Sequence, residues 1–353
     1  MKVSLGSRSL LTALIGLGMT CMLPNTAMAR VSGICSDCHT MHNSQNGVMD
    51  YTKGGTQLTQ NYSVLLKGDC IGCHTGDNVS GGNIPFVMAK NAPTYAPGEG
   101  SNNTLAGGNF WWVATAGTAV DSKGHNVANL AAVDGAPGIG KTPPGSLAAW
   151  TTQLTCAGTN GCHGDRTVAD QFSSIAGGHH GNDSIIDGST PVKSFRFLKG
   201  VLGSEDDDWE FEAAVDHNWY KGAARTNDTE NVTSTISSLC GQCHDKFHNG
   251  ANEVDGGSWG GPWVRHPTDF DFSGIGGEYA AFDEGANYAT VPVGHVTPAT
   301  GQTDKIVLCI SCHRAHGSPN ADLLRWSYST MDAHNGTTGN VGCFACHTTK
   351  DDA

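Results

Sequence analysis

Apolar residues and long hydrophobic runs are scarce in this sequence. Hydrophobic side chains make up 38% of its 353 residues, against about 45–50% in ordinary globular domains. Glycine is abundant, with 48 copies. Beyond the first 29 residues, no stretch approaches the roughly 18 apolar residues that a membrane-spanning helix needs. The sequence therefore predicts a loop-rich chain that is short of core and does not span a membrane.

The first 29 residues have the pattern of an export signal. Lys2 and Arg8 form a basic start, residues 10–23 are apolar, and Ala27-Met28-Ala29 is a cleavage site of small residues. We expect residues 1–29 to be removed, together with Cys21. We expect residues 30–353 to form a single elongated domain, exported to the outer surface or the periplasm.

Positive charge is also scarce. After the signal, 18 Lys and Arg face 33 Asp and Glu, a formal net charge of −15. This charge argues against nucleic acid and anionic membranes as partners.

Every cysteine beyond the signal belongs to a pair that ends in Cys-His. Five pairs have the form CxxCH, the pattern that attaches c-type haem. In that chemistry the two thiols become thioethers to the porphyrin and the histidine becomes an axial iron ligand. The five motifs are Cys35-Cys38-His39, Cys70-Cys73-His74, Cys240-Cys243-His244, Cys309-Cys312-His313 and Cys343-Cys346-His347.

Other uses of paired cysteines fit poorly. A disulfide framework does not require histidine after each second cysteine, and a redox C-x-x-C occurs once. Zinc sites pool two ligand pairs at short fixed spacings, whereas the six Cys-His motifs start 34 to 86 residues apart. The sequence therefore predicts covalent haem.

The sixth motif, Cys156-AGTNG-Cys162-His163, is stretched by three residues. Its inserted residues could loop out and still allow two thioethers, or Cys162 alone could be attached. With this motif included, we expect six c-type haems, held at their proximal side by His39, His74, His163, His244, His313 and His347.

Histidine supplies the distal ligands more readily than methionine. The sequence has 16 His, of which ten remain after the proximal six, whereas only four Met follow the signal. Bis-His ligation gives lower reduction potentials than Met ligation. We expect the six distal ligands among seven histidines that have local signatures: His42, His125, His180, His248, His266, His295 and His316. His217 and His334, in Asp- and Asn-rich stretches, best fit surface or hydrogen-bonding roles, and one of His179 and His180 is expected to be a ligand.

Regular secondary structure is predicted to be sparse. Turn-forming residues recur every few positions, so we expect a multihaem cytochrome c fold of coil and turn, with short helices and little strand, wrapped around a linear chain of six haems. Short helices are expected at residues 237–247 and 306–314. Residues 110–113, Phe-Trp-Trp-Val, favour a strand or an aromatic patch.

The motif set resembles the outer-surface hexahaem c-type cytochromes of metal-reducing bacteria that polymerise into conductive nanowires. The likeness lies in CSDCHTMHNS, GGNFWWV, KGHNV, CGQCH with FHN, RHP, YATVPVGH, CISCHRAHGS with LLRWSYS, and CFACHTTKDD. It is ordered along the whole exported chain but departs at the stretched motif, where a regular CxxCH with a nearby His is replaced. His180 is expected to supply the missing ligand.

This resemblance implies six bis-His haems in alternating parallel and T-shaped pairs. It also implies that His42 ligates a haem of the next identical protomer, the one on His313, so that protomers join head to tail. The function expected is extracellular electron transfer without catalytic residues, with periplasmic or outer-membrane cytochromes and extracellular acceptors as redox partners. A monomeric shuttle and, less favoured, a reductase with one open haem site are the alternatives.

Overall fold

The computed structural model describes residues 34–45, 48–49, 62–78, 84–94, 105–115, 117, 119–135, 142–146, 148–181, 184–206, 217–227, 229–249, 253–254, 263–333 and 341–350. The expected signal, Cys21 and His334 lie outside these residues. None of the helices in the described part is long and apolar enough to cross a membrane.

All helices of the described chain are short, which confirms the prediction of coil with short helices. No α-helix exceeds five residues, and the 3-10 helices are equally brief. The α-helices are α1 (Cys35–Cys38), α2 (Cys70–His74), α3 (Trp111–Ala114), α4 (Gln171–Ser174), α5 (Ile236–Cys240), α6 (Asp245–Asn249), α7 (Glu284–Asn287) and α8 (Cys309–Cys312). The 3-10 helices are η1 (Ser63–Leu65), η2 (Asp121–Lys123), η3 (Phe195–Phe197), η5 (Gly277–Ala281), η6 (Ala321–Leu323), η7 (Tyr328–Thr330) and η8 (Gly342–Ala345).

Strands of two or three residues form one five-stranded sheet, with the order β5-β6-β10-β11-β9. Only the contact between β6 and β10 is parallel. These strands are β5 (Gly203–Ser204), β6 (Trp219–Lys221), β9 (Phe270–Asp271), β10 (Gly294–His295) and β11 (Ile306–Val307). Three two-stranded sheets pair β1 (Ser44–Gln45) with β2 (Val48–Met49), β3 (Thr155–Ala157) with β4 (Gly161–His163), and β7 (Glu253–Val254) with β8 (Trp263–Val264).

The expected helices occur in altered form. Residues 237–247 divide into α5 and α6, and residues 306–314 begin as β11 before α8. The aromatic segment at residues 110–113 is neither a strand nor only a patch, because α3 starts at Trp111 while Phe110 and Val113 pack in a core cluster.

The apolar core is divided into three clusters. One surrounds the five-stranded sheet and includes Ile306 and Leu308, and a second lies towards the C-terminus around Phe272 and Phe282. The third is centred on Phe110, Val113 and Val127. Side chains alone therefore provide no continuous core along the described chain.

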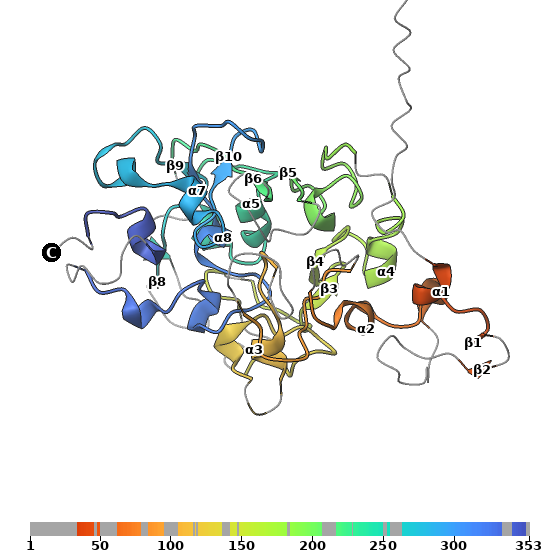
Figure 1. Cartoon of the computed structure of the whole chain (residues 1–353). Coiled ribbons are helices and arrows are strands. Elements are labelled where there is room, and N and C mark those ends of the chain that lie inside the picture. Colours follow the sequence, from red (N-terminus) through yellow and green to blue (C-terminus); the bar gives the residue numbers. More distant parts are fainter. Residues whose placement is uncertain are drawn as a thin grey trace, which may run out of the picture.

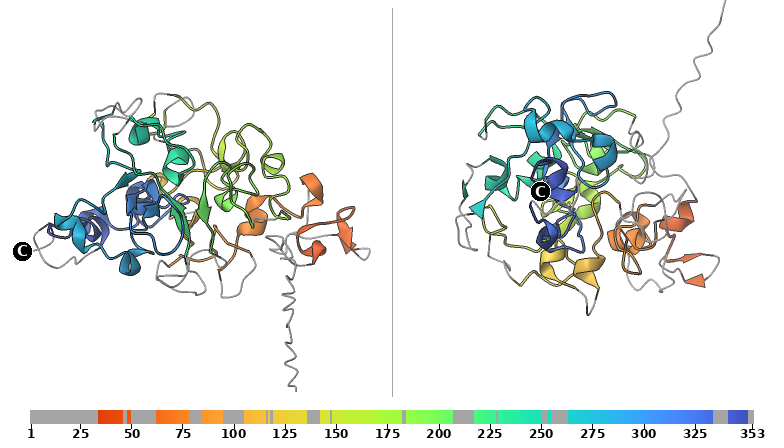
Figure 2. Two further views of the ribbon diagram at one scale, coloured as in Figure 1. Left: turned by 90° about the horizontal axis from the view of Figure 1, so that it is seen from above. Right: turned by 60° about the vertical axis from the view of Figure 1, so that its left-hand side comes forward.

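The two end motifs lie at opposite ends of the molecule. Figure 1 places α1, with the first motif, at the right-hand extreme and the C-terminus at the left. The view from above in Figure 2 shows the same separation, with the five-stranded sheet in the middle. The first and last motifs of the sequence are thus also far apart in space.

Candidate haem-binding sites

The cysteines of four of the five regular motifs lie on single helical turns, whereas α5 ends at Cys240 and Cys243 follows in a turn. α1, α2 and α8 each carry both cysteines of their motif, and η8 carries Cys343 with Cys346 directly after it. Residues three apart on a helix lie on one face, about 5–6 Å apart. The turn is fixed locally: in α2 the Asp69 side chain caps the helix by accepting from the Gly72 amide at 2.7 Å. Each turn therefore presents two thiols to one side.

The histidine after each regular motif is oriented through Nδ1. Backbone carbonyls accept a hydrogen bond from this atom at 2.7–3.0 Å in four of them, and in His163 of the stretched motif at 2.9 Å. The acceptors are Val64 for His39, Pro85 for His74, Arg196 for His163, Pro144 for His244 and Asp322 for His313. In His347 the Nδ1 atom lies 3.4 Å from the Glu278 carboxylate. Metal-ligating histidines use their second nitrogen in this way, which fixes the tautomer and the ring orientation.

Five of these six histidines face a second imidazole at nearly constant distance. Ring centroids are 6.0–6.3 Å apart in every pair. The pairs are His39 with His180, His74 with His179, His163 with His316, His244 with His125, and His347 with His266.

This separation fits one metal ion between two imidazoles. Each metal–nitrogen bond is about 2 Å and each ring centre lies roughly 1 Å beyond its nitrogen, so opposed ligands have centres about 6 Å apart. Two thiols on one face, an oriented histidine and a second imidazole opposite it are the donor set of a covalent bis-His haem. The described residues therefore fit this cofactor.

Burial keeps several of these imidazoles neutral, as iron ligation requires. Desolvation lowers the pKa of His244 to about 4, with the neighbouring His125 adding to the effect. Desolvation also lowers the pKa of His316 to about 3, assisted by His163. The pKa values of His125 and His163 are lowered by burial as well.

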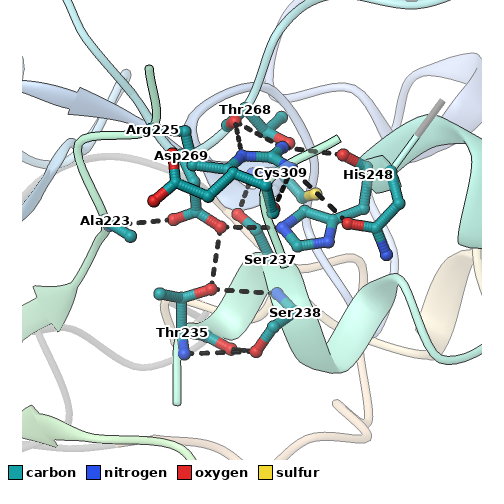
Figure 3. Close-up of polar contacts among 11 residues, drawn as sticks. Ala223, Arg225, Thr235, Ser237, Ser238, His248, Thr268, Asp269 and Cys309 are labelled. Carbon is teal, nitrogen blue, oxygen red and sulfur yellow. Dashed lines mark hydrogen bonds and ion pairs between the residues drawn. The ribbon is translucent and has the colours of Figure 1, made fainter. Parts of the chain in front are cut away.

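Two predicted distal ligands have other contacts. His248 is fully buried, and its Nε2 lies 2.8 Å from the Asp269 carboxylate. Figure 3 shows His248 and Thr235 both directed at Asp269, with Cys309 beside them. His295 is equally buried, with Nδ1 donating to the Asp304 carbonyl and Nε2 lying 2.8 Å from Glu284. Neither ring faces a motif histidine among the described residues.

The site at His313 lacks an opposite imidazole in the described part of the chain. His313 is the one motif histidine whose surface is exposed, and no second histidine ring faces it there. The predicted ligand His42 is itself exposed and has a left-handed backbone with φ of 58°.

Neighbouring motifs approach one another through their cysteines. Cys70 and Cys156 lie close enough for each thiol to shift the pKa of the other, and so do Cys240 and Cys309. Cys162 lies close enough to Cys243 for this neighbour to help raise the pKa of Cys162. Cys343 helps to raise the pKa of Cys312 in the same way. The first two sites are joined by the adjacent residues His179 and His180. The sites thus follow one another in sequence order.

Comparison with known proteins agrees with this donor set. The family described as "Doubled CXXCH motif" matches residues 298–352. The C-type cytochrome OmcS of Geobacter sulfurreducens is 26% identical over 342 residues, which cover 83% of this chain and 78% of OmcS. In sequence the chain resembles the c-type cytochrome OmcS along most of its length. It carries covalent c-type haem.

Two solved structures are also similar to this chain. The structure titled "Outer Membrane Cytochrome S Filament from Geobacter Sulfurreducens" matches with a TM-score of 0.44 and 20% identity, covering 85% of both chains. The structure titled "Cryo-EM of the OmcS nanowires from Geobacter sulfurreducens" matches with a TM-score of 0.43 and 19% identity, covering 84% of both.

Sequence reasoning missed two features of these sites. His179 faces His74, and the adjacent Gly-rich context could not distinguish it from His180. His180 was expected at the stretched motif, but in the structure it faces His39, and His316 faces His163. His217, expected in a surface or hydrogen-bonding role, is buried between Trp219 and Tyr288, with ring centroids at 4.4 and 5.1 Å, and its Nδ1 donates to the Asn218 carbonyl at 2.8 Å.

Proposed function

We propose that this protein is an exported hexahaem electron conduit that polymerises head to tail into a conductive filament. Its residues 30–353 form one elongated unit, and each of the six motifs holds one haem. His125, His179, His180, His266 and His316 supply five distal ligands, each facing its motif histidine at 6.0–6.3 Å. This set replaces His248 and His295, whose rings lie against buried or half-buried carboxylates.

Electron transfer is supported by the continuity of the sites. Successive motifs approach through their cysteines or share adjacent ligands, so haems attached there would form one row from end to end. Bis-His ligation gives low potentials suited to respiratory electron export. The terminal acceptors we propose are extracellular, with periplasmic or outer-membrane cytochromes as donors.

The observation that supports a filament is the incomplete ligand set at His313. His313 is exposed without a facing imidazole among the described residues, and His42, between α1 and β1 at one end of the molecule (Figure 1), is exposed too. We assign His42 of the next protomer to the haem on His313. A contact between two different surfaces is heterologous and yields a filament when its rotation does not close.

Exposed apolar side chains at both ends support the same contact. Ile34, Met41, Val64 and Leu65 are 55–71% exposed around the first motif. Near the other end, Val264 and Tyr328 are 77% and 73% exposed. Large exposed apolar groups of this kind mark interaction surfaces.

The decisive experiment replaces His42 with alanine in the haem-loaded protein. We expect filaments to disappear in electron micrographs, haem content to stay the same, and one haem per chain to become high-spin and bind carbon monoxide. His334→Ala is the control for the loss of a histidine, since His334 is not among the expected iron ligands, and it should leave filaments and low-spin spectra intact. Filaments surviving His42→Ala, or a high-spin haem appearing in His334→Ala, would overturn the assignment.

The same measurements separate the alternatives. A monomeric shuttle would show all-low-spin haem without filaments in the unaltered protein. A reductase would bind carbon monoxide or a small substrate at an open iron before any substitution. The five facing imidazole pairs favour electron transfer over a reductase, and electron microscopy decides between filament and shuttle.

A further inference from the structure

The stretched motif cannot present its cysteines as the other motifs do. Cys156 and Cys162 are six residues apart, so a helix would place them about 9 Å apart along its axis and on different faces. Four of the regular motifs instead hold cysteines three apart on one helical turn. A second way of bringing two thiols together is needed if both are to reach one porphyrin.

The structure provides it as a parallel strand pair. β3 and β4 are joined in the register Thr155↔Gly161 and Ala157↔His163, which sets Cys156 directly opposite Cys162. Neighbouring strands lie about 4.7–4.9 Å apart, and opposed residues of a strand pair point to the same face. The two thiols therefore share a face at a spacing close to the 5–6 Å of a helical turn.

Several hydrogen bonds hold this register. The Thr155 amide donates to the Asn160 carbonyl at 2.8 Å and the Gly158 amide to the His163 carbonyl at 3.1 Å. The Gln171 side-chain oxygen accepts from the amides of Cys156 and Ala157 at 3.1 and 3.3 Å. The strand pair is thus anchored both within the loop and to α4.

Glycine is required at the closest approach. A Cβ on Gly161 would lie 2.5–2.6 Å from backbone atoms of Ala157, inside any tolerable contact. Gly158 has φ of +82°, a conformation that favours glycine. The inserted residues therefore contain the glycines that this close pairing needs.

The histidine of the motif is oriented like the others. His163 follows Cys162 directly, donates from Nδ1 to the Arg196 carbonyl at 2.9 Å, and faces His316 at 6.3 Å. The iron-ligand positions are thus in place beside the paired thiols.

We propose that Cys156 and Cys162 both form thioethers to one haem, with the β3–β4 register replacing the helical turn. This inference rests on the proposed haem loading of the chain. In each attachment the S–H bond breaks, sulfur bonds to one carbon of a porphyrin vinyl group, and hydrogen goes to the other carbon. No electrons are exchanged, so no oxidant or reductant is consumed.

The competing arrangement leaves Cys156 as a spare thiol, with only Cys162 attached to the haem. The test is alkylation of the haem-loaded, denatured and reduced protein with iodoacetamide, followed by peptide mass analysis. We expect haem on the Cys156–Cys162 peptide with neither sulfur alkylated. Alkylated Cys156 beside haem-bearing Cys162, or a haem-free peptide, would overturn the proposal.

The remaining motif peptides distinguish this failure from failure of the proposed function. If they carry haem while this peptide does not, only the stretched site fails. If none carries haem, the conduit itself is refuted, and this inference with it.

Two substitutions sharpen the result. Gly161→Ala should break the register and make Cys156 alkylatable while Cys162 stays attached, whereas Thr159→Ala, at an exposed loop position, should change nothing. Cys156→Ala should shift the reduced pyridine haemochrome band to longer wavelength, because one haem regains a vinyl group. An unchanged band in Cys156→Ala would mean that Cys156 carried no thioether in the unaltered protein.

Discussion

At the scale of single residues, the histidines fall into two classes according to the groups that their ring nitrogens contact. Where a backbone carbonyl accepts from Nδ1 and a second imidazole lies opposite, as in His74 and His244, the ring is prepared for a metal. Where Nε2 lies against a carboxylate, as in His248, the ring is used to satisfy a buried polar network. Such a network stabilises the fold only while every member keeps its partner.

Asp269 is central to that network and allows a test of stability. Its side chain accepts from the Thr235 hydroxyl and the Ala223 amide as well as contacting His248, and it is fully buried. Asp269→Ala should lower the free energy of unfolding by about 3–5 kcal/mol, since removing one partner of a buried polar pair leaves the others unpaired. Denaturant titration of the haem-loaded protein measures this.

Asp187→Ala is the control for that loss. Asp187 also binds neighbouring donors, through Ser189 and Lys193, but its side chain is 43% exposed. We expect little change in its denaturation midpoint. An equal loss in both variants would show that burial of Asp269 is not the cause.

His295 should make stability depend on pH. Burial by itself lowers the pKa of His295, but its hydrogen bond to Glu284 and the charge of that carboxylate, with help from Asp304, outweigh burial and raise the pKa. A raised folded-state pKa stabilises the protein fully below the unfolded value of about 6.5, and this contribution is lost as pH rises through the folded value.

Denaturation midpoints at about pH 6 and about pH 9 test this dependence. The unaltered protein should be more stable relative to Glu284→Gln at the lower pH than at the higher one. A difference that stays constant between the two pH values would contradict the role of the Glu284 charge.

At the scale of elements, the sequence predicted those positions that depend only on neighbouring residues. CxxCH specifies both cysteines and the adjacent histidine within one turn, so these positions could be assigned without the fold. Distal histidines depend on residues far along the chain, and of those selected by motif context, His125, His266 and His316 face a motif histidine.

Long-range contacts explain what could not be predicted. His248 resembles His316 in following its motif closely, yet Asp269, 21 residues away, lies against its ring. The β3–β4 register was equally hidden, because three-residue strands have no readable periodicity. Short elements position these sites, but tertiary contacts choose which side chains meet there.

At the scale of the whole molecule, the described chain has little core of its own. Its buried apolar residues form three separate clusters, and the motif sites lie around and between them. Covalent haem would add a large apolar disc at each site and join distant segments, as a cross-link does.

The haem-free chain should therefore be largely unfolded. Expression without haem attachment, or with the motif cysteines replaced by serine, should give weak near-ultraviolet circular dichroism and no cooperative thermal transition. The haem-loaded protein is the control and should melt cooperatively. A compact haem-free form that melts in one transition would contradict this expectation.

The facing histidines also bear on how the protein matures. The two rings of a pair are between 81 residues apart, for His266 and His347, and 153 residues apart, for His163 and His316. Contacts of such long sequence separation form slowly. Thioether attachment needs only one short motif, so it can be complete while the axial pairs are still open. The exported chain would then first carry covalently bound haems with one axial ligand each. A continuous electron path would form only when the last long-range histidine pairs are made.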